Sequence, residues 1–344
     1  MNVNYKTKQI YSIILISIAL LGCRHDKKVD VSDIQVNVKI ERFDREFDAL
    51  RTKPFARQTA YLKSKYGAFY HDYIKLLLQE PVNTNDTAYF GLIKQIISGK
   101  PYHDLEHDVD SVYPNMDRVE AGLTDAFKHI KYYYPNKELP KIYTYTSGFM
   151  DQAVISDHYF GIGLDLFLGA NSRFYPSLTN MWPRYISRNF NEQNIVPRVV
   201  EGMAREDMFL ENDSNKTLLS KMIYNGKIMY YMDQILPTVP DSIKIGYTST
   251  QIKWCNQYKS AIWAYFLEEN LLYESDFMKI QKFLNPAPFT PGVGEKNDSA
   301  PRLAVWTGWQ IVKQYMDNNP NVTLQQLMGD NDAQKILNGS KYKP

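Results

Sequence analysis

The chain is poor in cysteine, and this shortage excludes a fold that disulfides hold together. Its 344 residues include two cysteines, Cys23 and Cys255. Cys23 ends an apolar leader and is predicted to carry lipid, so Cys255 has no expected intramolecular partner. The fold must therefore be stabilised by burial of apolar side chains, which the hydrophobic content of 44% can supply.

The net charge is also low, which argues against partners that bind through charge alone, such as nucleic acid. The formal charge is +2, and residues 1–22 contribute all of it through Lys6 and Lys8. The remainder of the chain is neutral and offers no long-range attraction to nucleic acid or to acidic lipid. We therefore expect no nucleic-acid partner.

Long apolar runs are absent apart from residues 10–21, and this run is too short to span a bilayer, which needs about 20 apolar residues. It follows Lys6 and Lys8 and ends in Leu20-Leu21-Gly22-Cys23. The ending resembles a lipobox, with an apolar residue at −3, a small one at −1 and Cys at +1. It predicts a lipoprotein signal peptide over residues 1–22 and lipid on Cys23. The alternative is a transmembrane anchor beside an incidental cysteine. The short length of the apolar run disfavours it.

The body is predicted to begin after a polar tether over residues 23–38 and to occupy residues 39–344. Helical spacing of apolar residues over 56–78, 87–98 and 116–134 predicts a mainly helical part over residues 39–138. Strand-like alternation follows at 141–147, 153–156 and 159–168, with turn residues between. Further helices are predicted at 197–209, 217–236, 250–270, 274–283, 306–318 and 323–327. The expected fold class is α+β, mainly α-helical with a small antiparallel sheet.

A sheet followed by two helices resembles zinc metallopeptidases, whose first helix carries His-Glu-x-x-His. Here that register falls on Val200-Glu201-Gly202-Met203-Ala204, so Val200 and Ala204 replace both histidines. The third ligand position falls on Asn225, a poor zinc ligand. The residues predict a zincin-like arrangement over 139–344 that lacks metal ligands, with no cofactor and no catalytic metal. An ordinary amphipathic core helix explains the same residues equally well.

Other motifs give little support for catalysis. The sequence has no G-x-S-x-G and no phosphate-binding P-loop. His103 and His107 are four residues apart, but they lie in an acidic segment that we interpret as a solvated helix face. Cys255 has no histidine nearby in sequence and is predicted to be a buried structural thiol.

Residues 158–185 combine many aromatic side chains with charged ones. Asp165, Tyr175 and Trp182 are candidates for an aromatic cleft or a partner surface. A plain aromatic core explains the same composition equally well.

Several stretches resemble the gliding motility lipoprotein GldB family of Bacteroidetes. They are Ile40-Glu41-Arg42-Phe43-Asp44-Arg45, Gly161 to Gly169, Met222 to Ile228, Val305 to Val312, Asp332 to Leu337 and Ser340 to Pro344. The resemblance covers essentially the whole mature chain and implies an envelope lipoprotein that supports gliding and the associated secretion of adhesins. It implies protein partners in that machinery and supplies no catalytic residues. The family often has Pro-Gly-Arg near Pro301-Arg302, where this chain lacks the glycine.

The leading hypothesis is thus a non-enzymatic lipoprotein of the cell envelope, held to a membrane by lipid on Cys23. In the phylum of the family that this chain resembles, outward sorting favours acidic residues just after the lipidated cysteine, so the mixed charges of residues 24–28 imply a body that faces the periplasm. One alternative is an envelope hydrolase whose site includes Glu201, Asp165 and Asp233. Another is a lipid-anchored module that binds peptide or glycan through the aromatic residues.

Overall fold

The computed structural model describes residues 29–84, 86–212, 214, 216–295 and 297–344. The predicted signal peptide and the lipidation site Cys23 lie outside these residues. Ile34–Pro344 forms one compact unit. In the described part of the chain, no helix is both long enough and apolar enough to cross a membrane.

The first third of this unit is mainly helical, as its sequence predicts. The predicted helix over 56–78 is two helices, because Gly67 adopts a φ of +53° and breaks it. The segment around His103 and His107, interpreted as a solvated helix face, belongs to a helix over residues 100–112 that also buries Leu105 and Val109. Pro101 occupies its first turn, where proline is tolerated. These helices are α2 (Phe43–Asp48), α3 (Phe55–Tyr66), α4 (Ala68–Leu78), α5 (Phe90–Ser98), α6 (Lys100–Val112) and α7 (Asp117–Tyr133).

The described residues form one sheet with the strand order β1-β2-β4-β3. The strands are β1 (Ile40–Glu41), β2 (Lys141–Tyr145), β3 (Ala153–Ile155) and β4 (Tyr159–Gly163). β2 pairs in parallel with both β1 and β4, and β3 pairs antiparallel with β4. The sheet is therefore mixed, and the prediction of an antiparallel sheet was wrong. Alternation along a strand indicates which side chains share a face, but it does not show that β4 inserts between β2 and β3.

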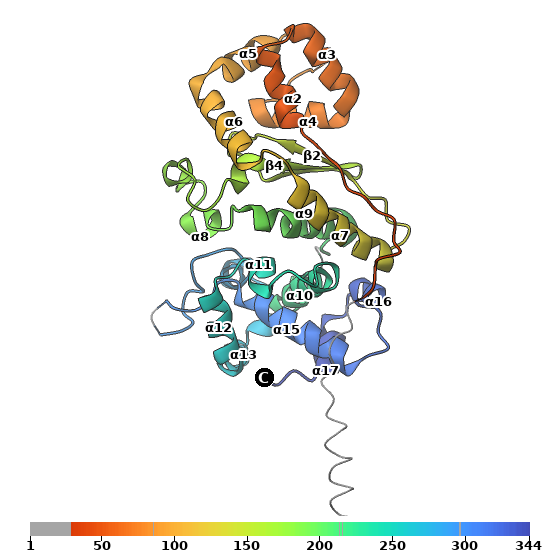
Figure 1. Ribbon diagram of the computed structural model, residues 1–344. Coiled ribbons are helices and arrows are strands. Elements are labelled where there is room, and N and C mark those ends of the chain that lie inside the picture. The colour runs from red at the N-terminus through yellow and green to blue at the C-terminus, as the bar shows by residue number, and fades with distance from the viewer. Residues whose placement is uncertain (1–28, 85, 213, 215, 296) are drawn as a thin grey trace, which may run out of the picture. The chain divides into compact units, whose positions relative to one another are not determined.

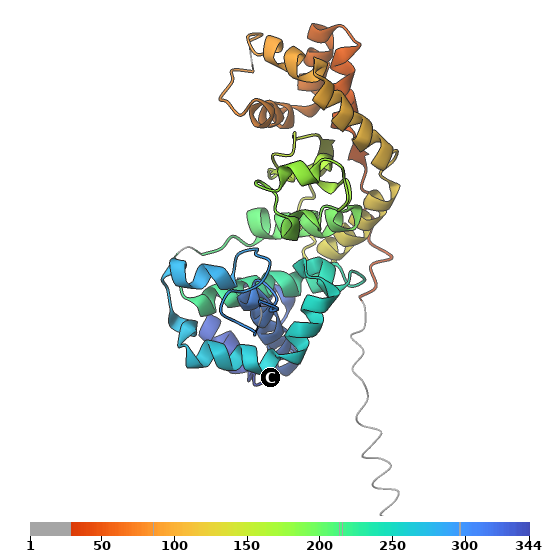
Figure 2. The ribbon, with the colours of Figure 1, turned by 90° about the vertical axis from the view of Figure 1, so that its left-hand side faces the viewer.

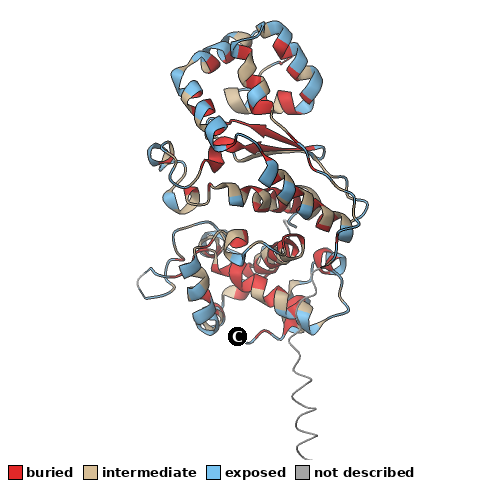
Figure 3. Ribbon diagram, in the orientation of Figure 1, coloured by how far each residue is buried: buried red, intermediate tan, exposed pale blue. Residues whose placement is uncertain are grey.

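The sheet separates two apolar cores of the described residues. On one face, Tyr143, Tyr145 and Tyr159 pack with the aromatic side chains of α2, α3 and α4. On the other face, Ile142 and Phe160 join the core that α7, α9 (Ile195–Met203) and the C-terminal helices share. Figure 1 shows α2 to α5 on one side of β2 and β4 and α9 on the other, and the buried colour of these strands in Figure 3 agrees.

Helices dominate the remaining part of the unit, which Figure 2 shows from a second side. Beyond α9 they are α10 (Leu218–Ile235), α11 (Asp241–Ile245), α12 (Ser249–Gln257), α13 (Lys259–Glu268), α14 (Phe277–Ile280), α15 (Leu303–Asn318), α16 (Leu324–Gly329) and α17 (Ala333–Ser340), and the short α8 (Arg184–Ser187) precedes it. Short 3₁₀ segments lie at η1 (Ala49–Arg51), η2 (Leu164–Phe167), η3 (Tyr175–Leu178), η4 (Glu192–Asn194), η6 (Leu271–Tyr273) and η7 (Gln281–Phe283).

The helices α10 and α15 touch through their backbones. A Cβ atom at Gly308 would lie 1.9 Å from the carbonyl oxygen of Met222, and one at Gly226 would lie 2.3 Å from that of Gly308. Both positions therefore require glycine, since a Cβ cannot approach a backbone oxygen so closely. This contact fixes α10, which carries Asn225, against the C-terminal helices.

The body begins slightly before the predicted boundary at residue 39. Val38 is buried, and its N–H donates to Thr124 Oγ1 of α7 at 3.0 Å. The N–H of Ile40 donates to Glu120 Oε1 at 2.9 Å. The end of the predicted tether is thus bound to α7. The division of the body at residue 139 stays a prediction.

Candidate functional site

The two positions at which a zinc peptidase carries histidine are both in the core. Val200 and Ala204 lie on α9 and its continuation, and both side chains are fully buried. The helix packs closely under β4, because a Cβ at Gly202 would lie 2.8 Å from the Phe160 ring. These positions therefore contribute to packing against the sheet.

The remaining two positions, Glu201 and Asn225, meet at one side chain. After Met203 the helix continues as a single π-helical turn, η5 (Ala204–Met208), in which the N–H of Phe209 donates to the carbonyl of Ala204 at 2.8 Å. Arg205 lies in this turn. Its Nε donates to Glu201 Oε1 at 2.8 Å, and its NH2 group donates to Asn225 Oδ1 at 3.0 Å. The Arg205 guanidinium thus joins Glu201 of α9 to Asn225 of α10, two positions of the degenerate metal site that the zincin-like interpretation predicts.

The electrostatic surroundings hold Glu201 as a carboxylate. Burial alone would raise its pKa, but the positive charges of Arg205, Arg302 and Arg198 outweigh this effect and lower the pKa to about 2. Arg205 and Glu201 expose about a fifth of their side chains, at 20% and 19%. A carboxylate so strongly paired is a weak base, because a general base works best when its pKa lies near the working pH.

A partly open cavity of about 200 Å³ lies beside Glu201. Its charged wall includes Arg188, Arg198 and Arg302, and its apolar wall includes Phe167 and Phe190. The wall combines residues of α9 with residues from the loop before it, from the end of α11 and from the start of α15. The cavity is therefore built from segments that are far apart in the sequence.

Asp165 is fully buried and holds the turn after β2 in place. Its carboxylate accepts hydrogen bonds from the N–H of Ser147 at 3.0 Å, from the Ser147 hydroxyl at 2.9 Å and from the N–H of Phe149 at 2.5 Å. Burial raises its pKa, and these hydrogen bonds oppose the rise. The arrangement stabilises the backbone at Gly148 and Phe149, where φ is +69° and +67°.

Tyr175 and Trp182, the aromatic candidates, are hydrogen-bonded to the backbone around Asp165 and Phe149. The Tyr175 hydroxyl donates to the carbonyl of Asp165 at 3.0 Å and accepts from the N–H of Leu168 at 2.9 Å. Trp182 is half-buried, and its indole N–H donates to the carbonyl of Phe149 at 2.7 Å. Tyr175 is buried, so these contacts place it in the core. A binding surface at Trp182 stays a prediction.

Asp233, the third carboxylate of the alternative hydrolase, is held in an ion-pair network. Lys244 Nζ lies 2.5 Å from its Oδ1, and Trp309 Nε1 donates to its Oδ2 at 2.7 Å. Lys313 lies 3.3 Å from the same Oδ2. The network joins α10, α11 and α15, which is a structural role.

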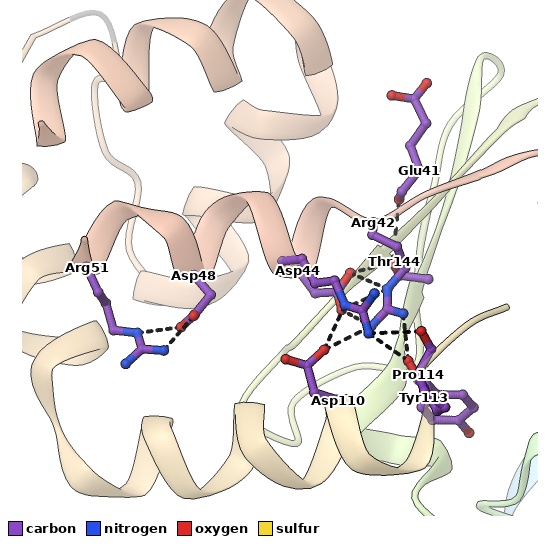
Figure 4. A network of polar contacts seen from close by, with 10 residues as sticks. Glu41, Arg42, Asp44, Asp48, Arg51, Asp110, Tyr113, Pro114 and Thr144 are labelled. Carbon is purple, nitrogen blue, oxygen red and sulfur yellow. Dashed lines mark hydrogen bonds and ion pairs between the residues drawn. The ribbon is translucent and has the colours of Figure 1, made fainter. Parts of the chain in front are cut away.

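The Ile40 to Arg45 stretch forms a second polar network, which Figure 4 shows. Arg42 binds the buried carboxylate of Asp44 through Nε at 3.0 Å and NH2 at 2.7 Å, and Thr144 of β2 donates to Asp44 at 2.6 Å. Arg42 and Arg45 also donate to the carbonyl of Tyr113 at 2.8 and 3.1 Å. This stretch therefore ties α2 to the sheet and to the end of α6.

Two further candidates from the sequence are His103, which lies on the surface, and Cys255, which lies in the core. His103 lies near Arg51 on the surface, at 2.8 Å between Nδ1 and the guanidinium NH1. Cys255 is buried, which raises the pKa of its thiol. Among the residues that the structure describes, no group of three or more His, Cys, Asp and Glu side chains is placed to hold a metal ion.

Sequence reasoning missed the arginines around Glu201. A signal for two of them exists, because Arg198 and Arg205 lie three residues before and four residues after Glu201, on the same helix face. No such signal exists for Arg188 and Arg302, which only the fold brings to the same cavity.

Comparison with known proteins gives one relationship. Residues 24–344 match the model of a protein family described as Gliding motility protein GldB. No curated protein and no solved structure matches the chain, so the zincin-like relationship stays a prediction. The family match covers nearly the whole chain and agrees with the resemblance found in the sequence. The chain therefore belongs to the GldB family of gliding motility proteins.

Proposed function

We propose that this protein is a non-catalytic lipoprotein of the cell envelope that supports gliding motility and the associated secretion machinery by binding protein partners. Membership of the GldB family implies the role in gliding motility. The lipobox that ends at Cys23 supports attachment to a membrane through lipid, with the folded body in the periplasm.

The observation that carries the non-catalytic part is the position of Arg205. Its guanidinium donates to both Glu201 and Asn225. In the zincin-like interpretation, these two residues mark the place of the catalytic ion, and a cation fixed between them leaves the Glu201 carboxylate occupied. We infer that the sheet, α9 and α10 serve as a scaffold here.

The alternative hydrolase receives less support from the same geometry. Glu201 is paired with Arg205, Asp165 is bonded to Ser147, and Asp233 is paired with Lys244. Each carboxylate is thus engaged by a neighbour, whereas a general base needs a carboxylate free to accept a proton from the substrate.

Complementation of a deletion strain tests the proposal. The wild-type chain and Glu201→Gln should both restore spreading, adhesin secretion and envelope integrity, since no carboxylate chemistry is required. Cys23→Ser should restore none of them, because the body loses its anchor. The protein level of each variant is measured by immunoblot. A Glu201→Gln protein that is present at the normal level and fails to restore function would contradict the non-catalytic part. Full function of Cys23→Ser would contradict the anchor.

A further inference from the structure

The cavity beside Glu201 gathers polar groups that lack partners. Nε of Arg188, Nε of Arg198 and Nε of Arg302 are buried and have no hydrogen-bond partner in the described part of the protein. Oδ1 of Asn194 is in the same state, and all of these residues line the cavity. Buried polar atoms are nearly always hydrogen-bonded in folded proteins. Four buried polar atoms around one cavity that have no partner in the described chain therefore point to a ligand that binds there.

Two of the three unpaired N–H groups belong to side chains that other hydrogen bonds already hold in place. Arg188 donates through NH2 to the carbonyl of Gly246 at 3.2 Å and to Gln251 Oε1 at 2.9 Å. Arg302 donates through NH1 to the carbonyl of Ile245 at 3.3 Å. These bonds use other nitrogens of each guanidinium and leave Nε free. Arg188 and Arg302 are thus held before any ligand arrives, which lowers the entropy lost on binding.

The charges on the cavity wall do not balance. Glu201 is the acidic residue of the wall, and Arg205 already pairs with it. Lys244 also lines the cavity, but it is paired with Asp233 and Asp241. Arg188, Arg198 and Arg302 remain as positive charges, and burial lowers the pKa of Arg188 and of Arg302. Arginine nevertheless stays protonated in proteins, so the cavity wall is cationic. Because the arginines are buried, their charges are also poorly solvated.

The backbone at Arg302 adds to this field. Its φ of +53° is unusual for a residue with a side chain and places Arg302 at the N-cap of α15. No side chain of the described residues caps this helix. The free N–H groups at a helix N-terminus favour a negative charge. The strained residue therefore lines the cavity and marks the start of α15 beside it.

We propose that this cavity binds a small organic oxyanion, a carboxylate or phosphate group attached to an apolar body. Guanidinium groups bind both kinds of oxyanion through paired N–H bonds. Phe167, Phe190 and Ile243 provide an apolar wall for the rest of the ligand, and the volume of about 200 Å³ limits it to a small molecule. This site is independent of the lipid anchor and of any role in motility.

Isothermal titration of the full chain in non-ionic detergent tests the proposal. The probes are phenyl phosphate, benzoate, inorganic phosphate and the neutral analogue benzyl alcohol. At least one of the two aromatic anions should bind, and it should bind more tightly than inorganic phosphate and benzyl alcohol. Arg188→Gln combined with Arg302→Gln should weaken that binding about tenfold or more, because it removes two charged hydrogen-bond donors.

Matched variants keep the result interpretable. Arg173→Gln removes an exposed arginine that is paired with Asp108 and does not line the cavity, so it should leave binding unchanged. If the double variant does not melt cooperatively, Arg198→Gln replaces it, because the Nε of Arg198 makes no bond to the described chain. No binding of either aromatic anion would overturn the proposal. Equal binding by benzyl alcohol or by inorganic phosphate would do so too, as would full affinity in the folded cavity variants.

Discussion

Arg205 donates a hydrogen bond to Asn225 at 3.0 Å and so joins the end of α9 to α10. The same guanidinium donates to Glu201 one turn earlier on its own helix. In the zincin-like interpretation, which stays a prediction, a metal ion would join these two helices. In this chain, the Arg205 side chain makes the connection between α9 and α10.

Replacement of Arg205 by alanine should therefore destabilise the body. The change leaves the mostly buried Glu201 without its hydrogen-bonding partner and removes the link to Asn225, which together cost about 1–3 kcal/mol. Urea unfolding followed by circular dichroism measures the effect. Arg173→Ala is the control, because Arg173 forms an exposed pair whose loss costs less than about 1 kcal/mol. Equal stability of the two variants would show that the bridge contributes nothing.

The same pair predicts a loss of stability in acid. The pKa of Glu201 is about 2 in the folded protein, against an ordinary value of 4.5. Its contribution to stability is thus fully present above pH 4.5 and is lost as the pH falls from 4.5 toward 2. Glu201→Gln should flatten this part of the curve of unfolding free energy against pH. A variant whose stability falls as steeply as that of the wild type over this range would refute the assignment.

At higher pH, the buried carboxyl group of Glu106 should make the protein less stable as the pH rises. This residue of α6 is 5% exposed, and its Oε1 has no partner among the described residues. Burial and the charges of Asp44, Asp48 and Asp165 raise its pKa from 4.5 to about 8. The folded state therefore holds a proton that the unfolded chain releases, so stability falls as the pH rises from 4.5 to 8.

Glu106→Gln, which stays neutral, should remove this loss. The variant should be more stable than the wild type at pH 8, on the order of a few kcal/mol, and close to it at pH 4. Thermal unfolding at both pH values measures the difference. A variant that is less stable than the wild type at pH 8 would mean that the Glu106 carboxylate is stabilised where it lies.

Gly308→Ala should be strongly destabilising. The added Cβ would lie 1.9 Å from the carbonyl oxygen of Met222, so α10 and α15 must separate, at a cost of about 3 kcal/mol or more. Gly329→Ala in α16 is the matched control, since a Cβ there meets no atom of the described chain within 4 Å. Alanine favours the helix over glycine, so the control should be neutral or slightly stabilising. Equal melting temperatures of the two variants would contradict the close contact.

The sequence predicts some features of this fold because they depend on local spacing. The amphipathic helix Asp117–Tyr133 follows from apolar residues at three- and four-residue steps. The helix Leu218–Ile235 is a largely buried apolar segment that ends just before Pro237. The strand Lys141–Tyr145 follows from alternation. The order of the strands does not, because the pairing of β2 with β1 and β4 depends on how distant segments pack.

The candidate site was predicted in part for the same reason. The zincin-like interpretation predicts that Glu201 and Asn225 lie at one site, and in the structure both accept hydrogen bonds from Arg205. The π-helical turn that positions Arg205 has no sequence signal of its own. Arg188 and Arg302 are more than a hundred residues apart in the chain. Their meeting at one cavity depends on tertiary packing, which no local pattern encodes.

Metal analysis of the purified full chain tests the central claim most directly. The protein is incubated with zinc and dialysed, and its zinc content is measured by mass spectrometry beside Asn225→Ala and Glu201→Gln. Because Arg205 occupies the space between these side chains, the wild type should retain well below one zinc ion per chain, and the variants should not differ from it. One zinc ion per wild-type chain that both variants lose, in a preparation that cleaves peptides, would contradict the account.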